Sequence, residues 1–196
     1  MEVLRIVRTE ILVETWVASL PGIDDVRPHQ CPCCHGQHHQ DGCAIHGHGT
    51  RERTLWGPSE VGGEPTERLV LVRRFRCVRC HCVLIVVPAE VGPYVSFALP
   101  AILIALAAWA LDRATPGSLL SSLSPSPRRG DSDPWRWPSI RRWLKRRAVL
   151  FPQVDIPDFK SMRETAAALV AAMVARMSMA PAYATPAAAW RSALGP

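Results

Sequence analysis

Two pairs of cysteines with the spacing Cys-x-x-Cys constrain the fold of this chain more than any other feature. The first pair is Cys31 and Cys34, the second pair is Cys77 and Cys80, and 42 residues separate the two pairs. Each pair places two thiolates on one tight turn, and two such turns complete the tetrahedral four-sulfur shell of a structural zinc site. We therefore predict that these four cysteines bind Zn²⁺ on a zinc ribbon that brings the two turns together.

The cysteines and histidines are confined to one part of the sequence. All seven cysteines and all seven histidines lie between residues 29 and 82 of the 196. Disulfide scaffolds spread their cysteines over the fold, whereas metal sites concentrate them in close pairs. The clustering therefore favours a metal and a reducing, cytoplasmic location. The spacing leaves open whether the histidines or the other cysteines, which are Cys33, Cys43 and Cys82, form a second metal site.

The same four ligands argue against catalysis at the metal. A catalytic zinc site keeps one coordination position open and uses His or carboxylate ligands near a Glu base. Here four thiolates would close the shell. The sequence also contains no His-Glu-x-x-His motif and no glycine-rich phosphate-binding loop. We therefore expect a protein that is not an enzyme.

The order of apolar runs and turn residues predicts an α+β protein, in which a small zinc ribbon of about three strands is followed by a helical, helix-turn-helix-like unit. The candidate strands are residues 51–56, 67–76 and 83–87. The expected segments are an N-terminal helix or strand (1–28), the zinc ribbon (29–90), the helical DNA-binding unit (91–152), and a C-terminal helix and tail (153–196).

One apolar segment has the length of a membrane span. Residues 91–111 contain no charged side chain over 21 positions. Pro100, however, fits the first turn of a helix, which leaves about 12 residues of helix, or about 18 Å, against a hydrocarbon core of about 30 Å. We therefore expect a buried helix and no membrane association; the alternative is a membrane-associated protein that uses residues 91–111.

The positive charge of the chain is concentrated in one stretch. Residues 128–147 contain 8 basic and 2 acidic residues, and this excess equals the net charge of +6 of the whole chain. A helix that begins near Pro138, runs through Arg147 and stops before Pro152 would pack one face through Ile140, Trp143, Leu144, Ala148 and Phe151. Its other face would present cations to DNA phosphates. The predicted DNA contacts are Arg136, Arg141, Arg142, Lys145 and Arg146, with Arg73, Arg74 and Arg76 on the ribbon.

The last predicted helix carries an apolar seam. Ser161 and Glu164 form a capping box at its start, and apolar residues then recur at steps of three and four up to Met177. Such a seam suits packing on the body of the protein and self-association through residues 161–179 equally well.

Several motifs resemble bacterial zinc-ribbon proteins associated with insertion sequences. They are Cys-Pro-x-Cys at 31–34, His-Gly-x-x-x-Arg-x-Arg at 46–53, Arg-Phe-Arg-Cys-x-x-Cys at 74–80, Pro88, Tyr94-x-Ser96, and Ile-Arg-Arg-Trp-Leu at 140–144. In that group the ribbon is followed by a helix and a helix-turn-helix-like unit. The resemblance implies a DNA-binding accessory factor or regulator of a mobile element, acting in transposition. The alternative is an adaptor that docks a transposase or a polymerase subunit through the zinc ribbon and the C-terminal helix.

Overall fold

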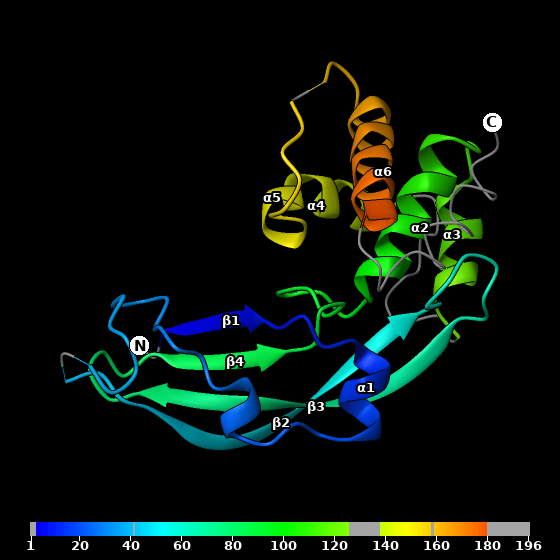
Figure 1. The fold of residues 1–196 in the computed structure, drawn as a ribbon. Helices are drawn as coiled ribbons and strands as arrows, with labels where there is room; N and C mark the ends of the chain where they lie inside the picture. The colour runs from blue at the N-terminus through cyan, green and yellow to red at the C-terminus, as the bar shows by residue number, and fades with distance from the viewer. Residues whose placement is uncertain (1–2, 41, 126–137, 158, 180–196) are drawn as a thin grey trace. The chain divides into compact units, whose positions relative to one another are not determined.

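The computed structural model describes residues 3–40, 42–125, 138–157 and 159–179 (Figure 1). Over these residues the chain forms a four-stranded sheet and six α-helices. The predicted mixed α+β class is confirmed, whereas a three-stranded zinc ribbon followed by helices is not, because the sheet has a fourth strand. The chain divides into two compact units, unit 1 (residues 1–55 and 68–96) and unit 2 (residues 56–67 and 97–196).

The sheet contains β1 (Leu4–Arg8), β2 (Ile45–Gly57), β3 (Thr66–Cys77) and β4 (Val83–Val87), in the order β1-β4-β3-β2 (Figure 1). β4 runs antiparallel to β3, with Phe75 opposite Leu84, and parallel to β1, with Leu4 opposite Val83. All five residues of β4 are buried. A run of Val, Leu and Ile without alternation is typical of a central strand covered on both faces.

Two side-chain hydrogen bonds fix the short helix α1 (Val13–Ala18) in unit 1. The Glu90 carboxylate accepts a hydrogen bond from the backbone N–H of Val13 at 2.9 Å, which satisfies one of the free amides at the start of the helix. Trp16 is 1% exposed, and its indole N–H donates to the carbonyl oxygen of Leu71 on β3 at 2.7 Å. The helix is therefore held against β3 by both burial and a directed hydrogen bond.

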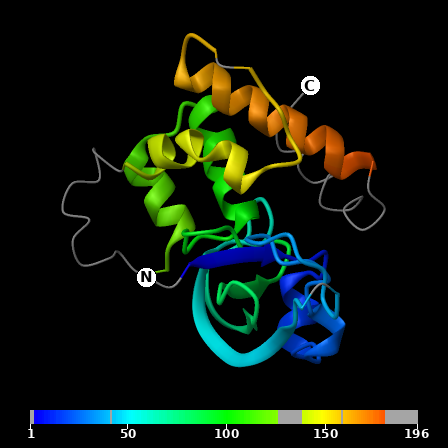
Figure 2. The same cartoon turned by 90° about the vertical axis from the view of Figure 1, so that its left-hand side faces the viewer.

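Strand β2 is long and strongly curved (Figure 2). Gly49 lies in its middle with φ of +83°, a conformation that side chains with a Cβ rarely adopt. A glycine inside a strand marks a bend or bulge, and here it allows β2 to curve between its ends.

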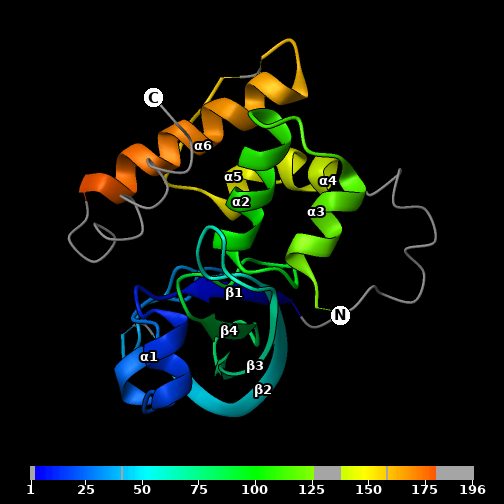
Figure 3. The ribbon, with the colours of Figure 1, turned by 90° about the vertical axis from the view of Figure 1, so that its right-hand side faces the viewer.

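Unit 2 is built around helix α2 (Leu99–Ala110), which packs against α3 (Pro116–Leu123), α4 (Ser139–Lys145) and α6 (Met162–Met179) (Figure 3). Seven of the 12 residues of α2 are buried, in agreement with the prediction of a buried apolar helix. Among the described residues, no helix combines the length and the apolar character that crossing a membrane requires.

Helix α6 begins at the predicted capping box. The Ser161 hydroxyl accepts from the Glu164 backbone N–H at 3.1 Å, and the Glu164 carboxylate accepts from the Ser161 N–H at 3.2 Å. The middle of the apolar seam, which is Ala166, Leu169 and Val170, is at most 1% exposed, and the helix packs against α2 and α4. Packing inside unit 2 thus uses the centre of the seam.

Gly57 provides a sharp test of packing in unit 2. Its φ is +111°, and a Cβ at this position would lie 2.3 Å from the Cβ of Ala101 on α2. Gly57→Ala should therefore lower the free energy of unfolding by about 1 to 2 kcal/mol for the backbone conformation and by about 1 to 3 kcal/mol more for the overlap. Denaturant unfolding followed by helical circular dichroism measures the loss. Gly62→Ala is the matched control, because Gly62 also has positive φ, +77°, but has open space around its Cβ position. Equal losses in the two variants would contradict the packing.

Candidate metal centre

The two Cys-x-x-Cys turns have the same backbone hydrogen-bond pattern. In the first turn, His35 N–H donates to Cys31 O at 2.8 Å and Cys31 N–H donates to Gly36 O at 3.0 Å. In the second turn, the corresponding bonds run from His81 to Cys77 at 2.9 Å and from Cys77 to Cys82 at 3.0 Å. The histidine after each pair has positive φ, +56° and +58°. The two turns are therefore copies of one local structure, whose signature Cys-x-x-Cys-His occurs at 31–35 and 77–81.

These turns bring four sulfur atoms together. The ligand atoms of Cys31, Cys34, Cys77 and Cys80 all lie within 4.8 Å of one another, and the group can hold a metal ion. The Cys31 and Cys80 sulfurs are 3.6 Å apart, and the Cys34 and Cys77 sulfurs are 3.8 Å apart. No other group of three or more His, Cys, Asp or Glu side chains in the described parts of the chain is gathered in this way. The Cys-x-x-Cys spacing thus predicted the four cysteines that the structure gathers into a group able to hold a metal ion.

A fifth cysteine, Cys43, contacts this group. It is 1% exposed, and its sulfur lies 3.6 Å from the Cys77 sulfur and 3.4 Å from the Gly36 carbonyl oxygen. A Cβ on Gly36 would lie 2.8 Å from the Cβ of Cys43, so glycine is needed above this side chain. The sequence spacing left the role of Cys43 open, because its nearest cysteine in the sequence is nine positions away.

The surroundings of Cys43 and Cys77 give the two contacting thiols different pKa values. Burial raises the pKa of Cys43 to about 12, and its contact with Cys77 contributes to that rise. Burial also acts to raise the pKa of Cys77, but hydrogen bonds from the Cys80 backbone amide and from the Cys43 thiol outweigh it and lower the pKa to about 7. Thiolates are the form that binds metals. The Cys43 thiol is thus placed to donate a hydrogen bond to Cys77, which belongs to the group of four gathered sulfurs.

Replacing Cys43 tests this assignment. Cys43→Ala should keep one metal ion per chain but lower the free energy of unfolding by about 1 to 2 kcal/mol, because the metal-bound thiolate loses a hydrogen-bond donor and a small cavity remains. Mass spectrometry under non-denaturing conditions gives the metal content, and denaturant unfolding gives the stability. Cys43→Ser keeps a donor and should also retain the metal. Loss of the metal from both variants would instead make Cys43 a ligand.

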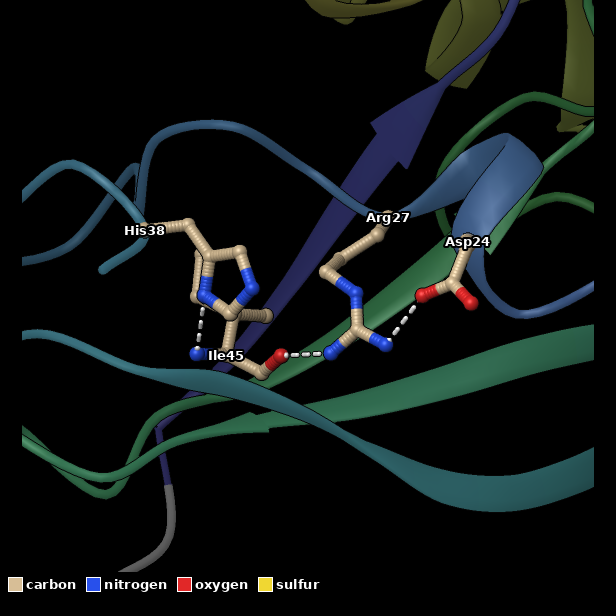
Figure 4. A network of polar contacts seen from close by, with 4 residues as sticks. All are labelled: Asp24, Arg27, His38 and Ile45. Carbon is tan, nitrogen blue, oxygen red and sulfur yellow. Dashed lines mark hydrogen bonds and ion pairs between the residues drawn. The ribbon is translucent and has the colours of Figure 1, made fainter.

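A polar network fixes the start of β2 beside the metal centre (Figure 4). The Arg27 guanidinium donates to the Ile45 carbonyl oxygen at 2.6 Å and to the Asp24 carboxylate at 2.5 Å. The Ile45 N–H donates to Nδ1 of His38 at 2.9 Å. Burial and the charges of neighbouring groups lower the pKa of His38, which favours the unprotonated Nδ1 that accepts this bond. Ile45 is therefore held on both of its backbone polar groups.

The predicted basic helix is divided in two, α4 (Ser139–Lys145) and α5 (Arg147–Leu150). The prediction of one helix through Arg147 is wrong because Arg146 leaves the helical conformation, with ψ of +11°, and shares its N–H between Arg142 O and Trp143 O. The break turns Ala148 outward, whereas the sequence placed it on the packed face. Ile140, Trp143 and Leu144 are buried as expected.

The predicted DNA contacts divide into three groups. Four are exposed on α4 and immediately after it, namely Arg141, Arg142, Lys145 and Arg146. On β3, Arg76 is exposed and Arg74 is half-buried, but Arg73 donates two hydrogen bonds to the Pro21 carbonyl oxygen, at 2.9 and 2.7 Å. Arg73 therefore has a structural contact that the sequence did not indicate. Arg136 lies outside the described residues.

In comparisons with known proteins, no protein-family model, no curated protein and no solved structure matches the chain.

Proposed function

We propose that this is a non-catalytic DNA-binding protein whose sheet unit folds around a structural zinc ion and whose helix α4 contacts phosphates. The charge arrangement of α4 carries the proposal. Arg141, Arg142 and Lys145 are exposed, while the residues between them pack into unit 2. The ion pairs among the described residues are Arg27–Asp24 and Arg68–Glu14, so the α4 cations have no acidic partner there. Cations exposed on a packed helix, with no acidic partner in the described part of the chain, are suited to neutralise phosphates.

Zinc is the metal that best suits the cysteine group. A tetrahedral site with Zn–S bonds of about 2.3 Å has sulfur–sulfur edges of about 3.8 Å. The sulfur–sulfur distances across the two turns agree with that geometry: 3.6 Å between Cys31 and Cys80, and 3.8 Å between Cys34 and Cys77. Four thiolates also form the closed shell of a structural site, which leaves no coordination position for a substrate.

An accessory or regulatory role in transposition is the biological setting that the sequence resemblance adds to this proposal. The adaptor alternative has weaker support, because the buried centre of the α6 seam is used inside unit 2. Among the seam residues whose side chains the structure describes, Met162, at 48% exposure, is the one most accessible to a partner.

Salt-dependent binding to DNA tests the proposal. Fluorescence anisotropy with a labelled duplex of random sequence should give a logarithmic affinity that falls linearly with the logarithm of the salt concentration. Four phosphate contacts correspond to a slope of about −3.6. Absence of binding at about 50 mM salt, or an affinity that does not change with salt, would contradict the proposal.

A further inference from the structure

We infer that the ring of Tyr94 in unit 1 stacks on an unpaired nucleic-acid base, and that Arg51 contacts the phosphate next to that base. Tyr94 is 64% exposed and belongs to the loop between β4 and α2. The inference rests on the proposed DNA binding and extends it from duplexes to single strands, in which the faces of the bases are accessible.

The exposure of Tyr94 contrasts with the burial of its neighbours in the sequence. Val91, Gly92 and Pro93 before it are buried, and so is Val95 after it. Of residues 91–99, all of which the structure describes, Tyr94 is the one that is exposed. The loop therefore packs on both sides of Tyr94 and leaves its aromatic side chain accessible to a ligand.

The backbone of Tyr94 does not call for an aromatic residue. Pro93 and Tyr94 occupy the centre of a turn, and Tyr94 has φ of +58°. A turn with Pro at its first central position and positive φ at its second normally has Gly or Asn there, because a bulky side chain is strained in this region. Strained residues persist where their surroundings fix them, and they are concentrated at functional sites. The strain at Tyr94 therefore supports a role for its ring at the surface.

A single side chain fixes the turn from β2. The Nη2 group of Arg53 donates to the carbonyl oxygen of Val95 at 2.8 Å and to that of Gly92 at 3.4 Å. These two carbonyl groups lie on either side of Tyr94 in the sequence, so the turn that carries the ring is held at both of its ends. A ligand that stacks on a ring held in this way loses less free energy to the ordering of the loop.

Arg51 adds a positive charge near the same turn. It lies two positions before Arg53 on β2, so the two side chains leave the strand on the same side. The charge of Arg51 adds to the effect of burial in lowering the pKa of Arg53, as expected for neighbouring guanidinium groups. Arg51 is exposed and belongs to neither of the ion pairs among the described residues. An exposed aromatic ring with a cation nearby is the combination with which proteins bind single strands: the ring stacks on a base and the cation contacts the backbone.

The test measures binding of a fluorescently labelled oligothymidylate to the full-length, zinc-loaded protein by anisotropy. Tyr94→Asn removes the ring, and Asn tolerates positive φ, so the fold should be retained while the affinity falls about 5- to 150-fold. Tyr94→Phe is the matched control, because it keeps an aromatic ring and should keep the affinity. Arg51→Gln should make the salt slope for the single strand less steep by about 0.7. Lys160→Gln, which removes an exposed cation of unit 2, should leave that slope unchanged.

The outcomes for single strand and duplex separate this inference from the proposal for α4. The inference is overturned if the original protein does not bind the oligothymidylate at about 50 mM salt, or if Tyr94→Asn binds it equally well. Duplex binding that depends on the α4 cations would still stand in both cases. If single-strand binding depends on Tyr94 while replacing the α4 cations leaves duplex binding unchanged, the inference stands and the α4 proposal fails.

Two further measurements test whether the ring contacts a base. Tyr94→Asn should weaken binding to the single strand more than binding to a duplex, in which neighbouring base pairs cover the faces of the bases; equal losses would overturn the stacking. Irradiation of an oligothymidylate that carries 5-iododeoxyuridine should produce a crosslink at Tyr94, located by mass spectrometry, and crosslinks at other residues alone would overturn it. A molecular mass that falls in Tyr94→Asn, measured by light scattering, would assign the ring to a contact between copies of this chain instead.

Discussion

A Cys77→Ser variant is expected to lose its metal ion and the fold of unit 1. Cys77 is buried, its sulfur lies 3.8 Å from that of Cys34, and it ends β3, which pairs with β4. Structural zinc contributes about 10 to 16 kcal/mol of binding free energy in small zinc-binding peptides, as much as or more than the about 5 to 15 kcal/mol that stabilises a typical domain. Serine cannot replace a thiolate ligand, so unit 1 should become sensitive to proteases and prone to aggregation.

The damage from Cys77→Ser should be confined to unit 1. All seven cysteines lie between residues 31 and 82, and none falls in the residues assigned to unit 2. Limited proteolysis should therefore release fragments from the sheet while most of the helical circular dichroism remains. Cys33→Ser is the control, because Cys33 is half-buried in the first cysteine turn but is not one of the four gathered sulfurs. A soluble Cys77→Ser protein that unfolds cooperatively without bound zinc would refute the structural role of the metal.

Replacing the exposed cations of the α4 region should abolish most of the salt-dependent DNA binding. The variant changes Arg141, Arg142, Lys145 and Arg146 together to Gln, which keeps helix propensity and removes four charges. Ile140, Trp143 and Leu144 remain packed, so the variant should stay folded and zinc-loaded. The slope of logarithmic affinity against logarithmic salt concentration, near −3.6 in the original protein, should lose most of its value. The drop in affinity between about 50 and about 200 mM salt should therefore be roughly a hundredfold smaller than in the original protein.

A control for the α4 experiment must remove charge without touching the helix. Lys160 and Arg176 are exposed cations of unit 2 outside α4, and changing both to Gln should leave the slope nearly unchanged. If the control and the α4 variant lose equal parts of the slope, binding reflects the general charge of the protein. If both retain it, the contact lies elsewhere in the protein.

Local patterns predicted the parts of the structure that depend on neighbours in the sequence. The Cys-x-x-Cys spacing identified the four gathered sulfurs, the β-branched run at 83–87 matches β4, and Ser161 with Glu164 form the predicted capping box. Residues 1–28 were expected to form a helix or a strand and contain both, β1 and α1. That β1 joins the sheet could not be predicted, because its partner β4 lies far along the chain. The break at Arg146 was missed because nothing in that sequence prevents a continuous helix; neither Gly nor Pro lies between residues 139 and 151.

The site held details that spacing alone could not give. Cys43 reaches Cys77 because the chain turns back at Gln40, whose carbonyl oxygen accepts from the Cys43 N–H at 2.8 Å. The repeated Cys-x-x-Cys-His signature was the available signal that the two turns share a backbone conformation. In each turn the residue after the second cysteine is also a histidine with positive φ, so the two turns match over five residues.

The parallel pairing of β1 with β4 has a consequence for the order in which the chain folds. Leu4 pairs with Val83, 79 positions later, so the first strand to be synthesised is the last one able to find its neighbour. Closing a flexible loop of that length costs about 4 kcal/mol in chain entropy by the (3/2)RT ln n relation. Once the metal joins the two turns, the path from Leu4 through Cys31 and Cys80 to Val83 spans only about 30 residues, and the cost falls to about 3 kcal/mol. Metal capture should therefore precede β1 docking, and hydrogen exchange during refolding should show protection at β3 and β4 before it reaches residues 4–8.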